Sequence, residues 1–142
     1  MNQQHPDLAA LMLRVSLGVM YLAHSLTKIF VFTLPGTAQF FVSLGFPGWL
    51  GYLTAFVELL GGMALLAGIQ VRWVALVLLP FMLGALSVHL PNGWSFAAPK
   101  GGWEFPAFWA AALVVQALLG NGALALSKNR APVALRRASE AV

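Results

Sequence analysis

The sequence predicts an all-α integral membrane protein, a bundle of four transmembrane helices with both termini in the cytoplasm. Hydrophobic residues fill 60% of the 142 positions and charged residues only 8%, and the mean hydropathy is +0.82. A soluble domain carries about a quarter charged residues, because water must wet its surface. Because so few charges cannot coat a globule, lipid is the expected solvent.

Four segments are apolar over roughly the 20 residues that a helix needs to cross the hydrocarbon core. They cover residues 8–32, 49–69, 73–90 and 105–126. Their Leu, Ala, Val and Gly content, without strict alternation, favours helices over a β-barrel. Pro80, inside the third segment, predicts a kink because it frees a backbone carbonyl.

The basic residues indicate the orientation, because cytoplasmic segments carry an excess of Lys and Arg. With both termini inside, Arg72 lies in a short cytoplasmic turn, whereas Lys100 and Lys28 lie toward the external side. Four further basic residues then lie inside, near the C-terminus: Lys128, Arg130, Arg136 and Arg137. We therefore expect a multi-pass protein of the bacterial inner membrane whose tail contacts anionic lipid and not nucleic acid.

The chain has no internal repeat and no low-complexity linker, which predicts one transmembrane domain over residues 1–130 and a flexible basic tail over 131–142. The first external connection contains residues 37–44, which are predicted to form a short interfacial helix. This helix would rest Phe40 and Phe41 among the lipid headgroups.

Ionisable residues within the spans are the best indicators of a site, since they are costly in lipid and face a bundle interior. At 100° per residue, Tyr21, Ser25 and Lys28 share one side of the first helix with Arg14, and His24 lies close to that side. One face of this helix is therefore polar, and we expect it to point inward.

Glu58 lies near the middle of the second span, on a face that it shares with small residues. Counted along the helices, His24 lies at the same depth as Glu58, Lys28 about one turn higher, and Arg14 far below. The prediction is a pocket in the outer half of the bundle with Glu58 at its floor. Glu58, His24 and Lys28 are the predicted catalytic residues, and Arg14 and Tyr21 are predicted ligand contacts. Two structural alternatives remain open: an ion pair of Glu58 with Lys28 or Arg14 that fixes helix register, and an Arg14 that snorkels to the cytoplasmic surface.

Four residues at the outer rim complete the predicted ligand contacts: His89, Trp94, Trp103 and Glu104. Each also has a simpler interpretation. His89 would be a loop hydrogen bonder, Glu104 would neutralise a helix N-terminus, and the tryptophans would be membrane anchors.

The chain lacks cysteine, which excludes disulfides and thiolate metal sites within it. His24, Glu58, His89 and Glu104 are ligand types that suit iron, manganese or zinc. However, no Glu-x-x-His or His-x-x-x-His pair is present, and Lys28 would repel a cation, so no metal site is predicted. Haem ligation by two histidines is no better supported than the metal site. No phosphate-binding loop or nucleophile elbow occurs in the sequence.

The ordered motifs resemble those of the DoxX family of small membrane proteins. They are residues 14–18 (RVSLG), 24–28 (HSLTK), 44–47 (LGFP), 58–62 (ELLGG), 66–68 (LAG) with Arg72, His89 with a Gly-rich loop, 104–106 (EFP) and 120–127 (GNGALALS). Ser25 departs from the Gly that the family often has after the histidine, a change between two small residues. The resemblance implies a four-helix membrane bundle, and some relatives are associated with quinone-linked oxidation of sulfur compounds or with complexes that detoxify oxidants.

Three functions are compatible with these features. The first is a redox-associated membrane subunit, such as a subunit of a quinone-linked oxidoreductase, that holds a quinone-like ligand and receives electrons from a partner redox protein or the substrate. The second is a non-enzymatic scaffold or assembly subunit whose buried charges serve packing. The third is a carrier of a small solute or protons, which requires a homo-oligomer because four helices enclose little space.

Overall fold

The computed structural model describes residues 5–127, and these residues are all helical or irregular, without a strand. The helices are α1 (Pro6–Leu26), α2 (Leu34–Ser43), α3 (Trp49–Ala67), α4 (Val71–His89) and α5 (Glu104–Leu119). A π-helical turn, η1 (Thr27–Val31), extends α1, and a 3-10 turn, η2 (Leu90–Asn92), extends α4. The predicted basic tail and the four basic residues near the C-terminus lie outside the described residues.

Three helical stretches are long and apolar enough to cross a membrane: Pro6–Val31, Trp49–Ala67 and Val71–Asn92. They agree closely with the first three predicted spans. The fourth apolar helix, α5, has 16 residues and is shorter than the others. The short helix predicted in the first connection is confirmed as α2, and α4 continues through Pro80.

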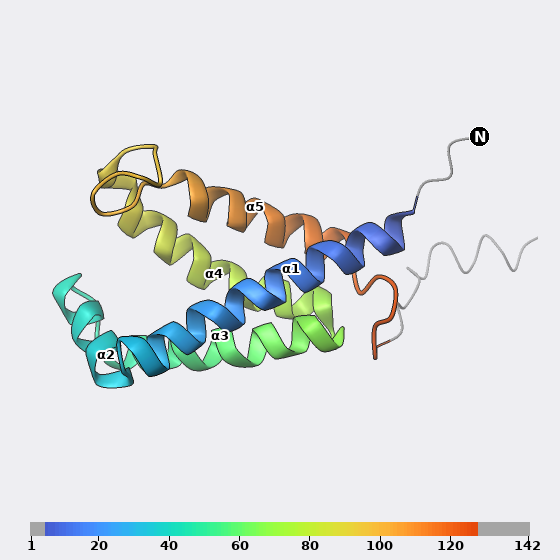
Figure 1. Ribbon diagram of the computed structural model, residues 1–142, viewed down its shortest axis with the longest axis horizontal. Coiled ribbons are helices and arrows are strands. Elements are labelled where there is room, and N and C mark those ends of the chain that lie inside the picture. Colours follow the sequence, from blue (N-terminus) through green and yellow to red (C-terminus); the bar gives the residue numbers. More distant parts are fainter. Residues whose placement is uncertain (1–4, 128–142) are drawn as a thin grey trace, which may run out of the picture.

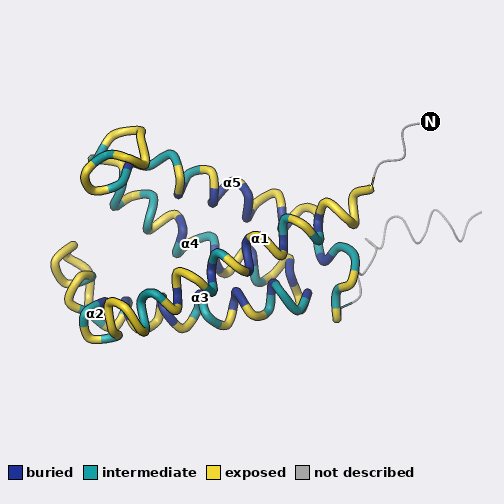
Figure 2. Tube along the Cα trace, viewed as in Figure 1, coloured by how far each residue is buried: buried dark blue, intermediate teal, exposed yellow. Residues whose placement is uncertain are grey.

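The helices form two antiparallel pairs, α1 with α3 and α4 with α5 (Figure 1). The pairs meet at the end that holds the start of α1 and the end of α5, which we call the terminal end. They diverge toward the other end, which holds α2 and the loop after α4 and which we call the loop end. The buried residues follow this arrangement and concentrate in the part where the pairs meet (Figure 2).

Glycines explain why the helices approach so closely where the pairs meet. A Cβ added at Gly18 would lie 2.8 Å from Cγ of Leu66 and 3.0 Å from the carbonyl oxygen of Gly62, so α1 and α3 touch through small residues. A Cβ at Gly61 would lie 2.8 Å from Cδ2 of Leu78, which makes this the close contact between α3 and α4. Small residues in such positions allow tight backbone packing between transmembrane helices.

The structure corrects the predicted end of the fourth span, because α5 ends at Leu119 and not near residue 126. Gly120 ends the helix with φ 80° and ψ −149°, and residues 120–127 then cross the terminal end. Ala123 N–H donates to the Asp7 carbonyl at 2.9 Å, and Ser127 N–H donates to the Gly68 carbonyl at 3.0 Å. This segment therefore ties the end of α3 to the start of α1.

At the loop end, α2 is attached to both α1 and α3. Thr37 Oγ1 donates to the Lys28 carbonyl at 3.0 Å, and this carbonyl lies within the π-helical turn. On the other side, a Cβ at Gly51 would lie 3.0 Å from Cα of Ala38, so α2 rests directly on α3. These contacts hold α2 beside the gap between the two helix pairs.

Candidate functional site

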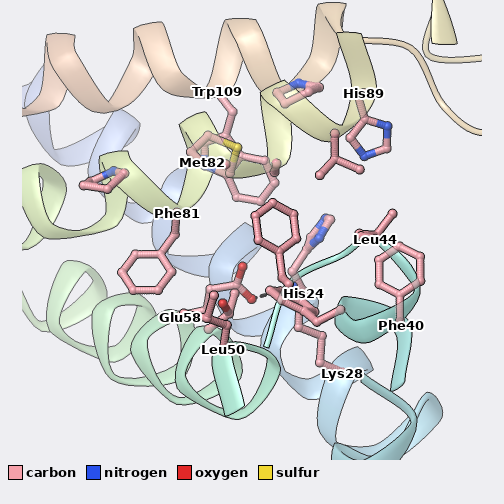
Figure 3. Close-up of a pocket in the computed structure, with 18 of the residues that line it drawn as sticks. His24, Lys28, Phe40, Leu44, Leu50, Glu58, Phe81, Met82, His89 and Trp109 are labelled. Atoms are coloured by element: carbon pink, nitrogen blue, oxygen red, sulfur yellow. Dashed lines mark hydrogen bonds and ion pairs between the residues drawn. The ribbon is translucent and has the colours of Figure 1, made fainter. Parts of the chain in front are cut away.

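A cavity of about 550 Å³ lies between the two helix pairs at the loop end (Figure 3). The walls are mostly apolar and aromatic, with α2 contributing Phe40, Phe41 and Leu44. Its polar side chains come from three helices: His24 and Lys28 from the first, Thr54 and Glu58 from α3, and His89 from α4. The volume falls within the range of about 300–1,000 Å³ that is usual for small-molecule sites.

An ion pair between α1 and α3 forms the polar centre of this cavity. Lys28 Nζ lies 2.6 Å from Glu58 Oε2, and the side chains are 20% and 9% exposed, respectively. Depth along the helices allowed Glu58 to meet either His24 or Lys28, and in the structure it pairs with Lys28. The π-helical turn contains Lys28 and so determines where its side chain leaves the helix. The pair is only partly covered, and both side chains line the cavity (Figure 3).

His24 lines the same cavity but packs against α5. Its ring meets Trp109 edge-on, with the ring centroids 4.9 Å apart. Trp109 also contacts Phe105 at 5.5 Å and Tyr21 at 4.8 Å, so these rings close the wall between α1 and α5. Tyr21 is fully buried behind that wall and does not line the cavity.

Arg14 lies at the terminal end, apart from the cavity. Its guanidinium donates to the carbonyls of Leu65 at 3.0 Å, Leu66 at 2.9 Å and Ala123 at 2.8 Å. The last carbonyls of a helix have no partner within it, so Arg14 satisfies the end of α3 and binds the crossing segment to it. Arg14 is 1% exposed, so its guanidinium ends on buried carbonyls and not at the surface of the described chain, and this placement gives Arg14 no contact with the cavity.

The four rim residues divide between the cavity and the loop. His89 lines the cavity, and its Nδ1 lies 2.9 Å from the Gly101 carbonyl oxygen, which fits the expected loop hydrogen bonder. Glu104 Oε1 accepts the N–H of Phe96 at 2.8 Å. Trp94 packs edge-on against Trp103 at 4.5 Å. Glu104, Trp94 and Trp103 thus organise the loop and do not line the cavity.

Sequence reasoning missed several wall residues. In the sequence, the only signal for Trp109 was that it shares one face of the fourth predicted helix with Gln116. Phe81 and Met82 carried no signal beyond their hydrophobicity. Phe40 and Phe41 were predicted to rest among headgroups, and both line the cavity. Among residues 5–127, no three His, Asp or Glu side chains gather closely enough to hold a metal ion.

The sequence profile of the DoxX family matches residues 9–90, more than half of the chain. The chain belongs to the DoxX family. The match contains all five polar side chains of the cavity but stops before α5. Together with the three long apolar helices, DoxX membership indicates a multi-pass membrane protein.

One similar protein is named "Putative oxidoreductase CatD", from Bacillus subtilis (strain 168). It is 34% identical over 80 residues, which cover 56% of this chain and 58% of that protein. The chain therefore matches little more than half the length of this relative. No solved structure matches the sequence significantly.

Proposed function

We propose that this DoxX protein is a redox-associated membrane protein that binds a quinone-like small ligand in the cavity between its helix pairs. The observation that carries the proposal is the Lys28–Glu58 ion pair, with N–O distance 2.6 Å, inside a cavity whose walls are otherwise apolar. Ionisable groups at this depth of a membrane protein are costly, and they usually mark ligand or proton sites. The name of the Bacillus relative supports a redox role.

The residues of the cavity suit a quinone ring. An ammonium has three N–H donors, and Glu58 accepts one of them, so Lys28 keeps donors for a ring carbonyl. His24, one helical turn earlier on the same helix, offers a second polar contact, and aromatic walls accommodate the ring. A bound quinone supplies two-electron chemistry that is coupled to protons. Glu58 would hold a proton beside the ring carbonyl, and His24 would relay it.

The electrons would come from a partner redox protein or from the substrate, and the chain would act as a subunit or homo-oligomer. For the membrane arrangement, α5 would be the fourth span. Its 16 residues reach about 24 Å, close to the hydrocarbon thickness when the flanking Trp94 and Trp103 lie among headgroups. The terminal end, with exposed Arg72, would face the cytoplasm of a bacterial inner membrane, and Lys100 would face outward.

The direct test uses the purified protein in lipid nanodiscs. Organic extraction and mass spectrometry should recover bound quinone from wild-type protein, and added decylubiquinone should raise its thermal unfolding temperature. Lys28→Met is the informative variant because it removes the donor at the polar centre, and Arg72→Met is its control because it removes an exposed charge elsewhere. The proposal fails if wild-type protein neither contains quinone nor gains stability from it.

The same ion pair also favours a second candidate, a membrane scaffold in which Lys28 and Glu58 only hold α1 against α3. A buried pair can fix helix register without any ligand, and well-packed apolar residues often replace it without loss. Under this alternative, the double variant Lys28→Met/Glu58→Leu retains abundance and assembly, and no ligand-dependent property of the protein changes with it.

A further inference from the structure

The cavity is closed on one side and open on another. Between α1 and α3 the wall is sealed, because Ser25 Oγ donates to the Ala55 carbonyl at 2.7 Å and the Lys28–Glu58 pair lies beside it. Between α1 and α5, Trp109 meets the rings of His24 and Phe105 edge-on and joins the two helices, although both of these outer rings are exposed. The remaining long side of the cavity lies between α3 and α4.

On that side, the close contact of Gly61 with Leu78 is the last tight approach of α3 and α4 before the cavity begins. Toward the loop end, the two helices face each other across the cavity, with Thr54 and Leu50 on α3 and Phe81 on α4 (Figure 3). Within the described part of the chain, no hydrogen bond joins α3 to α4 over this stretch. The two walls are apolar apart from Thr54 and Glu58 on α3 and His89 at the end of α4.

Gly84 marks the rim of this opening. It lines the cavity and is at the same time exposed, as is Pro80 one turn earlier. A Cβ built on Gly84 would meet no atom within 4 Å, whereas a Cβ on Gly61 would collide with Leu78. A residue that is both exposed and cavity-lining is expected where a cavity reaches the surface. Phe32, Phe40, Leu44 and Phe46 also line the cavity and are exposed, so it reaches the surface at the loop end as well.

The depth of the opening decides which solvent it meets. Glu58 lies midway along α3, whose 19 residues span Trp49–Ala67, and Gly84 lies about 7 Å from the loop end of α4 at 1.5 Å per residue. Both helices are long and apolar enough to be membrane spans. In a bilayer, the gap between them would therefore face acyl chains and not water.

We infer that the cavity opens sideways between α3 and α4 into the hydrocarbon core, with Gly84 at the rim, and that it takes a membrane-dissolved amphipathic ligand. The polar end of the ligand lies at Lys28 and Glu58, and its alkyl part leaves between Leu50 and Phe81. This inference rests on the proposed function in that the cavity is taken as the ligand site. It adds the route of entry, the requirement for an alkyl part, and a residue that controls access.

The competing route leads from the aqueous side at the loop end, past the exposed aromatic residues of α2. A ligand that enters there is water-soluble and needs no alkyl chain. The two routes make opposite predictions for a bulky side chain at position 84 and for the solvent that reaches this position.

The first measurement does not depend on the identity of the ligand. Because the chain has no cysteine, Gly84→Cys gives a single site for a nitroxide label in nanodiscs, as does Ala85→Cys one residue farther along the cavity wall. For each label, the rate of collision with molecular oxygen, which concentrates in hydrocarbon, is compared with the rate of collision with a nickel chelate, which stays in water. Val77→Cys on the exposed apolar face of α4 is the lipid control, and Ser95→Cys in the exposed loop is the water control.

Labels at positions 84 and 85 are expected to behave like the label at 77, with strong oxygen and weak chelate collisions. Chelate access comparable with that at position 95 overturns the inference, because the opening then meets water. This result stands whether or not a quinone binds.

The second measurement uses decylubiquinone and the same ring without its alkyl chain, and compares Gly84→Trp with Val77→Trp. Gly84→Trp should fold, since its Cβ meets no atom and glycine is a poor helix former. It should weaken or slow binding of the long-chain probe by about tenfold, with Val77→Trp unchanged. Equal binding by both variants, or tight wild-type binding of the chainless ring, overturns the inference. If wild-type protein binds neither probe, the proposed function fails, and the nitroxide measurement alone decides the route.

Discussion

The first helix carries two partly or fully buried cations, and the two ends of the molecule use them differently. At the terminal end, the Arg14 guanidinium donates to three backbone carbonyls through its two terminal nitrogens, and it does not line the cavity. At the loop end, Lys28 has one carboxylate partner and lies in the wall of a cavity. A planar fork with five donors can satisfy several carbonyls at once, whereas a compact ammonium keeps donors free.

The comparison separates a closed half from an open half. Where the pairs meet, glycine contacts and the crossing of residues 120–127 bring the helices together. Where they diverge, packing is replaced by a cavity with a neutralised pair of charges. We expect stability to be concentrated at one end and the proposed ligand binding at the other, and four sets of substitutions test this division.

The largest expected effect is on folding, from Arg14→Met. It removes the side-chain donor of three carbonyls, of which that of Leu65 keeps the Gly68 N–H at 3.2 Å, at about 1–3 kcal/mol for each buried acceptor left unpaired. We expect a large fall in abundance and in the thermal unfolding temperature in detergent. Arg14→Lys should restore little, because one ammonium cannot span both α3 and Ala123. Unchanged stability of Arg14→Met would remove the distinction between the two ends.

A smaller loss of stability, but a complete loss of ligand response, is expected from Glu58→Gln. It leaves the Lys28 ammonium without its carboxylate, and breaking a buried pair costs up to about 3–5 kcal/mol, with less expected here because Lys28 is 20% exposed. The double variant Lys28→Met/Glu58→Leu should regain stability in thermal unfolding but not decylubiquinone stabilisation. A double variant that still responds to decylubiquinone would show that the pair is only structural.

Two glycine-to-alanine substitutions provide a matched pair across the two halves. Gly122 has φ 70°, and its Cβ would lie 2.7 Å from Cβ of Ala10, so Gly122→Ala should destabilise the protein by about 1–3 kcal/mol. Gly84→Ala meets no atom and should be neutral or stabilising by up to about 1 kcal/mol. Chemical unfolding of both variants measures the difference, and equal losses would contradict the division into a closed and an open half.

Among the variants expected to lose stability, the smallest loss is expected from His24→Ala. His24→Ala removes its edge-on contact with Trp109, which is worth about 0.5–1.5 kcal/mol, together with its polar contact to the ligand. His24→Phe keeps a ring against Trp109 but offers no ring nitrogen. It should therefore unfold like wild type while binding decylubiquinone more weakly. Wild-type affinity in His24→Phe would exclude a polar role for this residue.

Much of the site could be predicted because it depends on distances along helices. Lys28 and Glu58 were placed at compatible depths by a rise of about 1.5 Å per residue, and their contact followed once the two helices packed antiparallel. Arg14 could not be assigned in the same way. Its partners are backbone carbonyls, at the end of another helix and in a segment predicted to be helical. The pattern of side chains does not show which backbone carbonyls will act as acceptors.

The sequence by itself determined the helical class, the three long apolar stretches, the DoxX resemblance and the inward polar face of α1, because composition and periodicity are local properties of the chain. Only the tertiary structure decided which cation pairs with Glu58, where α5 ends, and that α2 and Trp109 wall the cavity. These features depend on how helices rotate and cross. Small residues such as Gly61 and Gly62 allow close approach at one end, and no local pattern specifies how far the helices diverge at the other.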